Sequence, residues 1–249
     1  MTEGEFYSGT SNVVLPVKNK SFFPEDYRDK TRLCFYGSVF NSVEINSSFY
    51  KMPLARTAAK WASEVPDDFR FTFKLIQTVT HSIKRQFNLN PITEFMERIS
   101  AAGTKRGCLL VQLPPSFTLD IVQLGGLLST FESIDRDLRW PLTVEFRHAS
   151  WYTDQVFELL DSYNVAMVLH DIRKCPAPVE LTSDQLVYVR FHGPEGGYRG
   201  SYSDQFMEEY ASYIREWMSE GRTVYAYFNN TMGSAVQNLM TLNDLVKGS

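Results

Sequence analysis

Eight short segments with alternating apolar and polar residues limit the fold of this chain more than any other feature. A period of two is typical of β-strands, because successive side chains point to opposite faces of a sheet. A helical pattern follows nearly every one of these segments, and no low-complexity linker interrupts them. The predicted strands are Glu5–Thr10, Ser42–Ser47, Phe69–Leu75, Cys108–Leu113, Leu142–Arg147, Val165–Asp171, Val187–Gly193 and Thr223–Asn229.

The helical patterns fall between these strands and have recognisable ends. Asn90 is predicted to cap the third helix, Thr118 the fourth and Ser203 the sixth, which Gly221 ends. The proline-containing segment 173–184 is predicted to be a loop. Helical spacing is found in residues 24–40, 54–65, 90–99, 118–131, 156–163, 203–221 and 233–246.

Eight strand–helix units in 249 residues predict an α/β fold, a single (β/α)8 TIM barrel over residues 1–249. A doubly wound open sheet is the alternative, but the chain lacks the glycine fingerprint of a dinucleotide-binding turn. With 43% hydrophobic residues the chain can bury a core of the size that a barrel requires.

Charge and cysteine content narrow the class of protein. The net charge of −4 argues against a surface that coats DNA in general, although it allows one local basic pocket. The three cysteines have no paired spacing, so neither a disulfide framework nor a zinc ribbon is indicated. No basic N-terminal region precedes an apolar run, and no apolar run approaches about 18 residues, so we expect a cytoplasmic protein without membrane contact.

Polar side chains gather where the predicted strands end. In a TIM barrel the inward residues at the carboxyl ends of the strands form the site, so these side chains are expected to converge on one mouth. The loops after the seventh and eighth strands are rich in glycine and asparagine, as in barrels that bind phosphate there. The converging residues are Glu44, Asn46, Lys74, Gln112, Glu145, Arg147, His170, Asp171, Arg190, His192, Tyr227 and Asn229.

Three interpretations of these residues remain open. Pairs such as Glu44 with Lys74, or Glu145 with Arg147 or Arg190, can be structural ion pairs inside a barrel layer. A metal site is possible, but the chain has no His-x-His spacing, and its cationic residues would repel a metal ion. Binding of an anion fits the cations and the loops best, and ordinary turn chemistry is the alternative explanation of the loops.

Seven stretches carry a resemblance to a known family. They are Val43–Tyr50; Trp61 with Pro66 and Phe69; Phe73–Lys74 with Thr80–His81; Glu145–Trp151; His170–Asp171; Arg190–Gly193 with Tyr198 and Tyr202; and Tyr227–Asn230. In this order they resemble the YecE-like proteins, also called domain of unknown function 72. The resemblance implies a TIM barrel and, by similarity of fold, a relationship to endonuclease IV-type barrels, but it brings no settled activity.

The chain departs from this family at its first loop. Ser11 is followed by Asn12, Val13 and Val14, where the family usually has Gly-Trp and then a tyrosine. What that loop recognises is therefore expected to differ.

The resulting hypothesis is an enzyme, a hydrolase or lyase, that acts on a phosphate-bearing or other anionic small molecule or on a nucleic acid end. Glu145 and Glu44 are the candidate general acid and base, with His192 as the alternative proton carrier. No metal, cofactor or obligate protein partner is predicted. The alternatives are a non-catalytic protein that binds a nucleotide or nucleic acid, and a metal-dependent nuclease similar to endonuclease IV. The predicted substrate-binding residues are Lys74, Arg147, Arg190, His170, Asp171, Asn46, Tyr198, Asn229 and Asn230.

Overall fold

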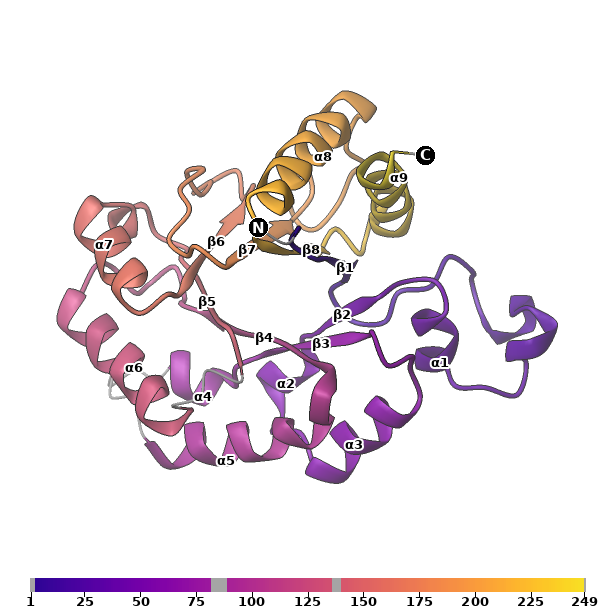
Figure 1. Cartoon of the computed structure of the whole chain (residues 1–249), viewed down its shortest axis with the longest axis horizontal. Coiled ribbons are helices and arrows are strands. Elements are labelled where there is room, and N and C mark those ends of the chain that lie inside the picture. The colour runs from indigo at the N-terminus through magenta and orange to yellow at the C-terminus, as the bar shows by residue number, and fades with distance from the viewer. Residues whose placement is uncertain (1–2, 82–88, 136–139, 249) are drawn as a thin grey trace.

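The computed structural model describes residues 3–81, 89–135 and 140–248 and contains one parallel eight-stranded sheet. From β2 to β8 each strand pairs with its neighbours in the sequence, and β1 pairs with β8, as expected for a TIM barrel, so that β1 and β2 are the two ends of the sheet (Figure 1). The strands are β1 (Phe6–Thr10), β2 (Ser42–Ile45), β3 (Arg70–Lys74), β4 (Arg106–Gln112), β5 (Leu142–Glu145), β6 (Ala166–His170), β7 (Leu186–Phe191) and β8 (Thr223–Phe228).

The barrel closes between β1 and β2 through a short contact. A parallel bridge joins Ser11 to Glu44, and the Asn12 backbone N–H donates to the Glu44 carbonyl at 2.7 Å. Lower down, Gly9 lies so close to β2 that a Cβ there would sit 2.0 Å from the Ser42 carbonyl oxygen. Only glycine fits at this point, and its use lets the first and second strands approach each other.

Helices surround the barrel on its outer side (Figure 1). Between β6 and β7 the chain forms a loop without a helix, as predicted from its prolines. The helices in the described ranges, with the 3₁₀ turns, are η1 (Lys20–Phe22), η2 (Glu25–Tyr27), α1 (Arg32–Gly37), α2 (Ser47–Tyr50), α3 (Ala55–Ser63), α4 (Gln77–Thr80), α5 (Leu89–Ile99), η3 (Ser100–Lys105), α6 (Ile121–Ile134), η4 (Ala149–Trp151), α7 (Asp154–Ser162), α8 (Asp204–Ser219) and α9 (Ala235–Lys247).

Three predicted helix starts differ from the structure. The first helix begins at Arg32, because the Thr31 side chain caps it by accepting from the Cys34 N–H at 3.1 Å. Asn90 lies inside α5 and does not cap it. The cap of α6 is Asp120, which accepts from the Gln123 N–H at 3.0 Å. Thr118 therefore precedes the helix without capping it.

The other two predicted signals of helix ends are confirmed. Ser203 caps α8 by accepting from the Phe206 N–H at 3.3 Å. Gly221 follows the end of α8 with a φ of 90°, a left-handed conformation that glycine adopts without strain.

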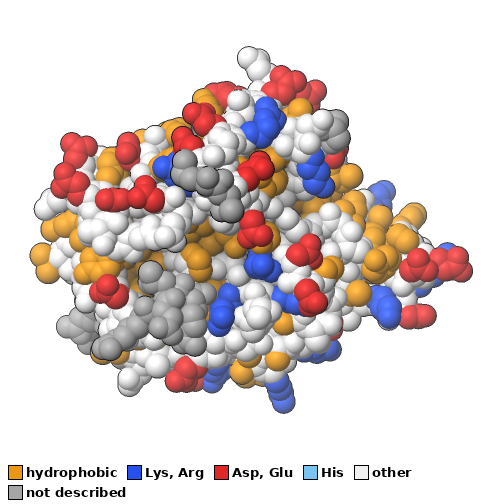
Figure 2. Space-filling view, viewed as in Figure 1, with side chains coloured by type: hydrophobic (Ala, Val, Ile, Leu, Met, Phe, Trp, Pro, Cys, Tyr) orange, Lys and Arg blue, Asp and Glu red, His pale blue; other side chains and the backbone are white. Residues whose placement is uncertain are grey.

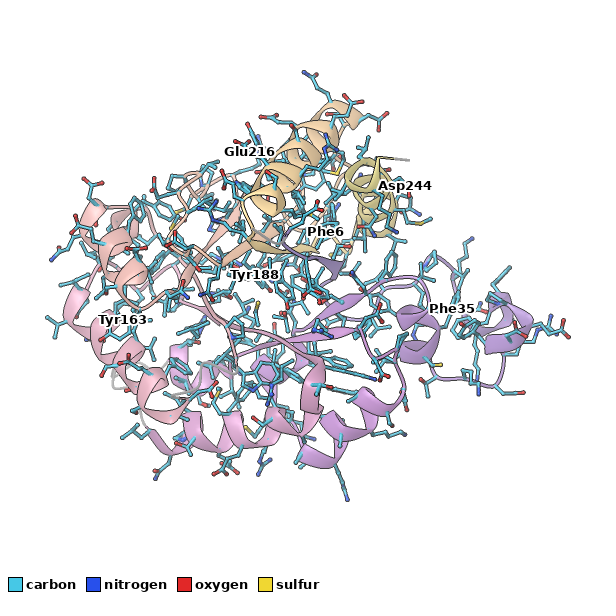
Figure 3. The ribbon with its side chains drawn as sticks, viewed as in Figure 1. Phe6, Phe35, Tyr163, Tyr188, Glu216 and Asp244 are labelled. Atoms are coloured by element: carbon cyan, nitrogen blue, oxygen red, sulfur yellow. The ribbon has the colours of Figure 1, made fainter. Side chains whose placement is uncertain are left out.

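Two apolar layers make up the core, one inside the barrel and one between the barrel and its helices. On β7, Val187, Val189 and Phe191 pack outward in the helix-covered layer. Tyr188 points inward, and Figure 3 shows it amid the strands. The alternation in the sequence therefore predicts the orientation of this strand correctly, and the Arg190 side chain points into the barrel as well. The inner layer consists of Tyr7, Cys108, Leu110, Ala166, Val168, Leu186, Tyr188, Tyr225 and Tyr227.

The surface mixes charges of both signs on the face seen in Figure 2, without a broad basic field. This agrees with a net charge of −4 and gives no support on this face to binding along a nucleic acid backbone. Among the described residues, no helix combines the length and the apolar character needed to cross a membrane.

Candidate functional site

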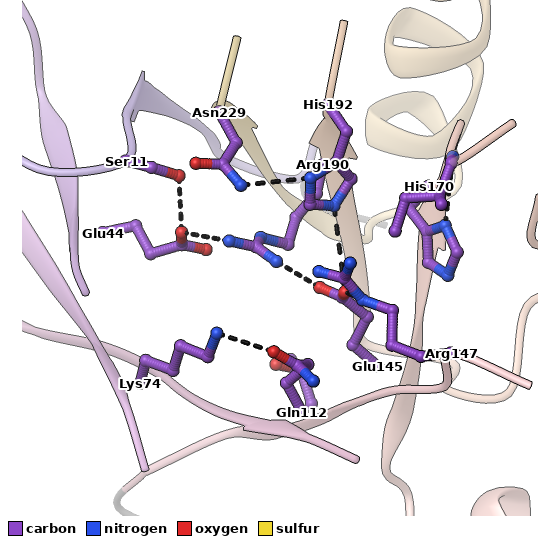
Figure 4. A network of polar contacts seen from close by, with 12 residues as sticks. Ser11, Glu44, Lys74, Gln112, Glu145, Arg147, His170, Arg190, His192 and Asn229 are labelled. Carbon is purple, nitrogen blue, oxygen red and sulfur yellow. Dashed lines mark hydrogen bonds and ion pairs between the residues drawn. The ribbon is translucent and has the colours of Figure 1, made fainter. Parts of the chain in front are cut away.

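Arg190 of β7 is the centre of a buried network of charged side chains at the carboxyl ends of the strands (Figure 4). Its side chain is 1% exposed, and its Nη2 donates to Glu44 Oε1 at 2.7 Å while its Nη1 donates to Glu145 Oε2. Burial alone would lower the pKa of Arg190, but Glu145 and Glu44 raise it, so the guanidinium stays charged.

This pairing differs from the expectation that Arg190 holds an anionic substrate. Two buried carboxylates already pair with its terminal nitrogens, and its Nε, without a partner among the described residues, is buried, so the charge of Arg190 is already balanced inside the barrel. The structural ion pair considered in the sequence analysis describes Arg190 better. The predicted pairing of Glu44 with Lys74 is wrong as well, since the partner of Glu44 is Arg190.

Glu44 of β2 accepts hydrogen bonds from three side chains, one after β1 and two on β7. Its Oε1 accepts from the Ser11 hydroxyl at 2.6 Å as well as from Arg190, and its Oε2 accepts from the Tyr188 hydroxyl at 2.6 Å. All of these side chains are buried. Glu44 thus ties β2 to β7 and to the residue after β1, which is a positioning role and not that of a general acid or base.

Glu145 of β5 is fully buried and ionised. Its Oε2 accepts from Arg190, and its Oε1 forms an ion pair with Nε of Arg147. Burial by itself would raise the pKa of Glu145, but Arg147 and Arg190 together hold it well below its ordinary value. A carboxyl group in this state has no proton to donate near neutral pH and is a weak base, so the predicted role as general acid is not supported.

His192, just after β7, is neutral and oriented by Asn229. The Asn229 side-chain amide donates to His192 Nδ1 at 3.0 Å, so the ring proton lies on Nε2, which is 3.8 Å from Glu145 Oε1. Burial, and after it the charge of Arg190, lower the pKa of His192 well below its ordinary value. The ring is therefore held neutral in one orientation, its buried Nε2 makes no hydrogen bond to the described residues, and its use as a proton carrier near neutral pH is not supported.

His170 and Asp171 hold the neighbouring strand ends in place. His170 Nε2 donates to the Phe146 carbonyl at 2.8 Å, and burial lowers the pKa of this imidazole too. Asp171 accepts from the His192 backbone N–H at 2.7 Å and from the Tyr202 hydroxyl. Both residues lie in the predicted region, but their polar atoms support the backbone of β5 and β7.

Arg147 and Lys74 are the cations that remain open toward the mouth. Nε of Arg147 forms an ion pair with Glu145 and is otherwise buried without a hydrogen bond, and the two terminal nitrogens donate to none of the described residues; the side chain is 14% exposed. Lys74 Nζ donates to the neutral Gln112 Oε1 at 2.7 Å and lies 4.2 Å from the centre of the Phe49 ring. Burial, with a contribution from Arg190, lowers the pKa of Lys74 to about 8.

The remaining predicted substrate-binding residues, Tyr198, Asn46 and Asn230, lie in different surroundings. Tyr198 is 43% exposed, and its ring centroid lies 5.9 Å from that of His192. Asn46 buries a side-chain oxygen that accepts no hydrogen bond from the described part of the chain. Asn230 is fully buried and donates to the Gly200 carbonyl at 3.1 Å, so it packs the loop and does not line the mouth.

Comparison with known proteins identifies the family. The profile described as "Protein of unknown function DUF72" matches residues 7–249. This chain belongs to the DUF72 family. The DUF72 chain is 25% identical over 251 residues to UPF0759 protein YunF of Bacillus subtilis (strain 168), covering 86% of this chain and 85% of that protein. It is 30% identical over 122 residues to UPF0759 protein YecE of Escherichia coli (strain K12), which is 49% of this chain and 43% of YecE.

Solved structures of the family have the same fold. The DUF72 protein of Enterococcus faecalis V583 superposes with a TM-score of 0.79 at 21% identity, covering 98% of this chain and 96% of that one. The DUF72 protein of Thermotoga maritima MSB8 gives a TM-score of 0.76 at 24% identity, with 98% and 99% covered. These likenesses support the barrel. The names of these relatives state no activity.

The first loop of this DUF72 chain turns at Asn12. Asn12 adopts a φ of 63°, a left-handed conformation that glycine prefers and asparagine tolerates. Its side-chain oxygen accepts from the Asn46 backbone N–H at 3.2 Å. Asparagine therefore keeps the turn and adds a bond across the seam between β1 and β2.

Sequence reasoning missed the partners that complete the network, namely Ser11 and Tyr188. Tyr188 carries a signal, because it shares the inward face of β7 with Arg190. Ser11 carries none, since its contact with Glu44 depends on how the barrel closes.

Proposed function

We propose that this protein binds a small anionic substrate between Arg147 and Lys74 at the mouth of the barrel and acts on it as a hydrolase or lyase. The observation that carries the proposal is the state of Arg147: Glu145 holds its inner nitrogen, and its two outer nitrogens have no partner among the described residues. A guanidinium fixed in this way is prepared to bind a carboxylate or phosphate through two parallel bonds.

The local charge balance supports an anionic ligand. Lys74, Arg147 and Arg190 carry positive charge at the mouth, while Glu44 and Glu145 carry negative charge and both histidines are neutral. Asp171 balances this excess of positive charge over the whole mouth, but the Tyr202 hydroxyl and the His192 N–H hold its carboxylate, and among the described residues no ion pair joins it to Arg147 or Lys74. An anion at the opening therefore meets two cations that Asp171 does not contact.

Lys74 is the proton carrier of this proposal in place of the glutamates. A pKa of about 8 leaves a useful fraction of the amine neutral near physiological pH, which a lysine with its ordinary pKa does not provide. Arg190, Glu44 and Glu145 then act as a rigid support that orients Arg147.

Calorimetric titration with phosphate, sulfate and small carboxylates tests the binding step. Arg147→Ala removes charge-assisted bonds of about 1.5–3 kcal/mol each, so affinity should fall roughly 10- to 100-fold. Arg56→Ala, which removes an exposed arginine of α3, is the matched control and should bind as the wild type does. No binding by the wild type, or equal binding by Arg147→Ala, would overturn the proposal.

Exposed tyrosines favour a second candidate, a protein that binds a nucleotide or nucleic acid end without catalysis. Tyr198 is 43% exposed near His192, and a base can stack on such a ring. Under this candidate, Tyr198→Ala should weaken binding of a mononucleotide while leaving binding of inorganic phosphate unchanged. Equal affinity of both ligands for the variant and the wild type removes the candidate.

A further inference from the structure

Lys74 lies in surroundings that do not resemble those of a structural lysine. Among the described residues its Nζ has no carboxylate within ion-pair distance, and its hydrogen bond goes to the neutral amide oxygen of Gln112. The charge is partly buried without an ionic partner, an arrangement that costs stability and that a purely structural lysine avoids.

The acceptor of Lys74 is fixed in orientation. The Gln112 side-chain amide donates its Nε2 to the Leu113 carbonyl at 2.9 Å, so its Oε1 must face Lys74. A neutral amine can keep this hydrogen bond through one N–H and still present its lone pair. Phe49 covers another side of the amine at 4.2 Å. The nitrogen is thus held in place in both of its protonation states.

The strand register brings this amine toward Arg147. Lys74 of β3 lies opposite Leu110 of β4, and Gln112, two residues further along β4, lies opposite Glu145 of β5. Lys74 reaches forward to Gln112, while Arg147 turns back to Glu145 (Figure 4). Both side chains therefore end at the level of the Gln112–Glu145 pair, with Lys74 bonded to Gln112 and Arg147 paired with Glu145.

We propose that Lys74 is a nucleophile that forms a Schiff base with a ketone or aldehyde whose anionic group is bound by Arg147. This inference rests on the anion site of the proposed function and assigns its substrate class, an anionic carbonyl compound such as a 2-oxo acid. Schiff-base chemistry requires a neutral amine held near the carbonyl carbon, and the geometry at Lys74 provides it.

Formation of the Schiff base needs no cofactor. The Lys74 nitrogen forms a bond to the carbonyl carbon, both amine hydrogens leave with the carbonyl oxygen as water, and a carbon–nitrogen double bond remains. A proton from solvent converts this imine to an iminium ion. Glu145 and Glu44 favour the charged iminium, whereas burial and the charge of Arg190 oppose it, as they oppose the charged form of Lys74 itself. An iminium accepts an electron pair from an adjacent bond, which is the chemistry that a lyase needs.

Reductive trapping tests the inference. The protein is incubated with cyanoborohydride and either pyruvate or acetone, which replaces the carboxylate of pyruvate with a methyl group, and adducts are located by peptide mass mapping. We expect one pyruvate adduct per chain at Lys74, none at this position in Lys74→Arg, and an unchanged yield in Lys51→Arg, which alters an exposed lysine. Arg147→Ala should lower trapping of pyruvate at least tenfold and leave trapping of acetone unchanged.

The outcomes of trapping and titration distinguish the anion site at Arg147 from the Schiff base at Lys74. Binding of phosphate that depends on Arg147, without any adduct at Lys74 in the wild type, overturns the Schiff base and leaves the anion site intact. An adduct at Lys74 that Arg147→Ala does not change supports the nucleophile but contradicts the anion site. Adducts spread over exposed lysines overturn the inference. Mapping on the wild type does not depend on whether a Lys74 variant folds.

Discussion

Arg190→Met removes the guanidinium between Glu44 and Glu145 and leaves a flexible apolar side chain in its place. Both carboxylates stay buried, and each loses the hydrogen bond that it accepts from Arg190. Breaking a buried ion pair by removing one partner costs about 3–5 kcal/mol. This cost applies once and not to each of the two carboxylates, because Ser11 and Tyr188 still donate to Glu44, and Arg147 still contacts Glu145.

The expected loss is large enough to measure by thermal unfolding. For a chain of this size about 1 kcal/mol shifts the midpoint by roughly 2–4 °C, so a loss of about 3–5 kcal/mol predicts a fall of roughly 6–20 °C. Arg56→Met removes an exposed arginine of α3 and is the control, with an expected change within about 0.5 kcal/mol.

The loss of stability in Arg190→Met should depend on pH. In the wild type the pKa of Glu145 is held well below its ordinary value, so its contribution to stability is present above the unfolded pKa and is lost as the pH falls through the folded pKa. Without Arg190 the burial of Glu145 is less well compensated, so its folded pKa rises and the variant is relieved by protonation. The penalty should therefore be smaller at about pH 5 than at about pH 8.

A penalty below about 1 kcal/mol, or one that is equal at both pH values, would refute this reasoning. Either result would mean that the two carboxylates find other donors or water once Arg190 is gone, and that the network does not form the rigid support that the site requires.

Three further predictions follow from single features of the structure. Acylation of Lys74 should rise through about pH 8, where its amine becomes neutral, as peptide mapping over a pH series can check. Gly9→Ala should leave little folded protein, because its Cβ would lie 2.0 Å from the Ser42 carbonyl oxygen. Gly126→Ala in α6, where a Cβ meets nothing within 4 Å, should instead stabilise the chain by up to about 1 kcal/mol in thermal unfolding. Elemental analysis of purified protein should find less than one metal ion per chain; a stoichiometric metal would support the endonuclease IV-like alternative.

Local pattern predicted the barrel and the inward-facing residues of its strands. Alternation on β7 was enough to place Tyr188 and Arg190 inside and Phe191 outside, because side chains in a strand alternate without regard to distant contacts. Helix ends were harder to predict, since several residues that can cap a helix compete near each start, as Thr118 and Asp120 do before α6.

The roles of the charged residues could not be predicted, because they depend on pairing across the barrel. Arg190 meets Glu44, 146 positions earlier in the chain, and Glu145, 45 positions earlier. Nothing in the local sequence indicates that the guanidinium and both carboxylates are paired with one another in these contacts. Only the closed barrel shows that Arg147 and Lys74 remain available.

A crystal structure of the protein grown with pyruvate or phosphate tests the central claim most directly. The account predicts density for the anion within hydrogen-bond distance of the outer nitrogens of Arg147, with Lys74 Nζ facing the same ligand. An anion bound instead to Arg190 with the network opened, or bound at the other end of the barrel with Arg147 and Lys74 untouched, would contradict it.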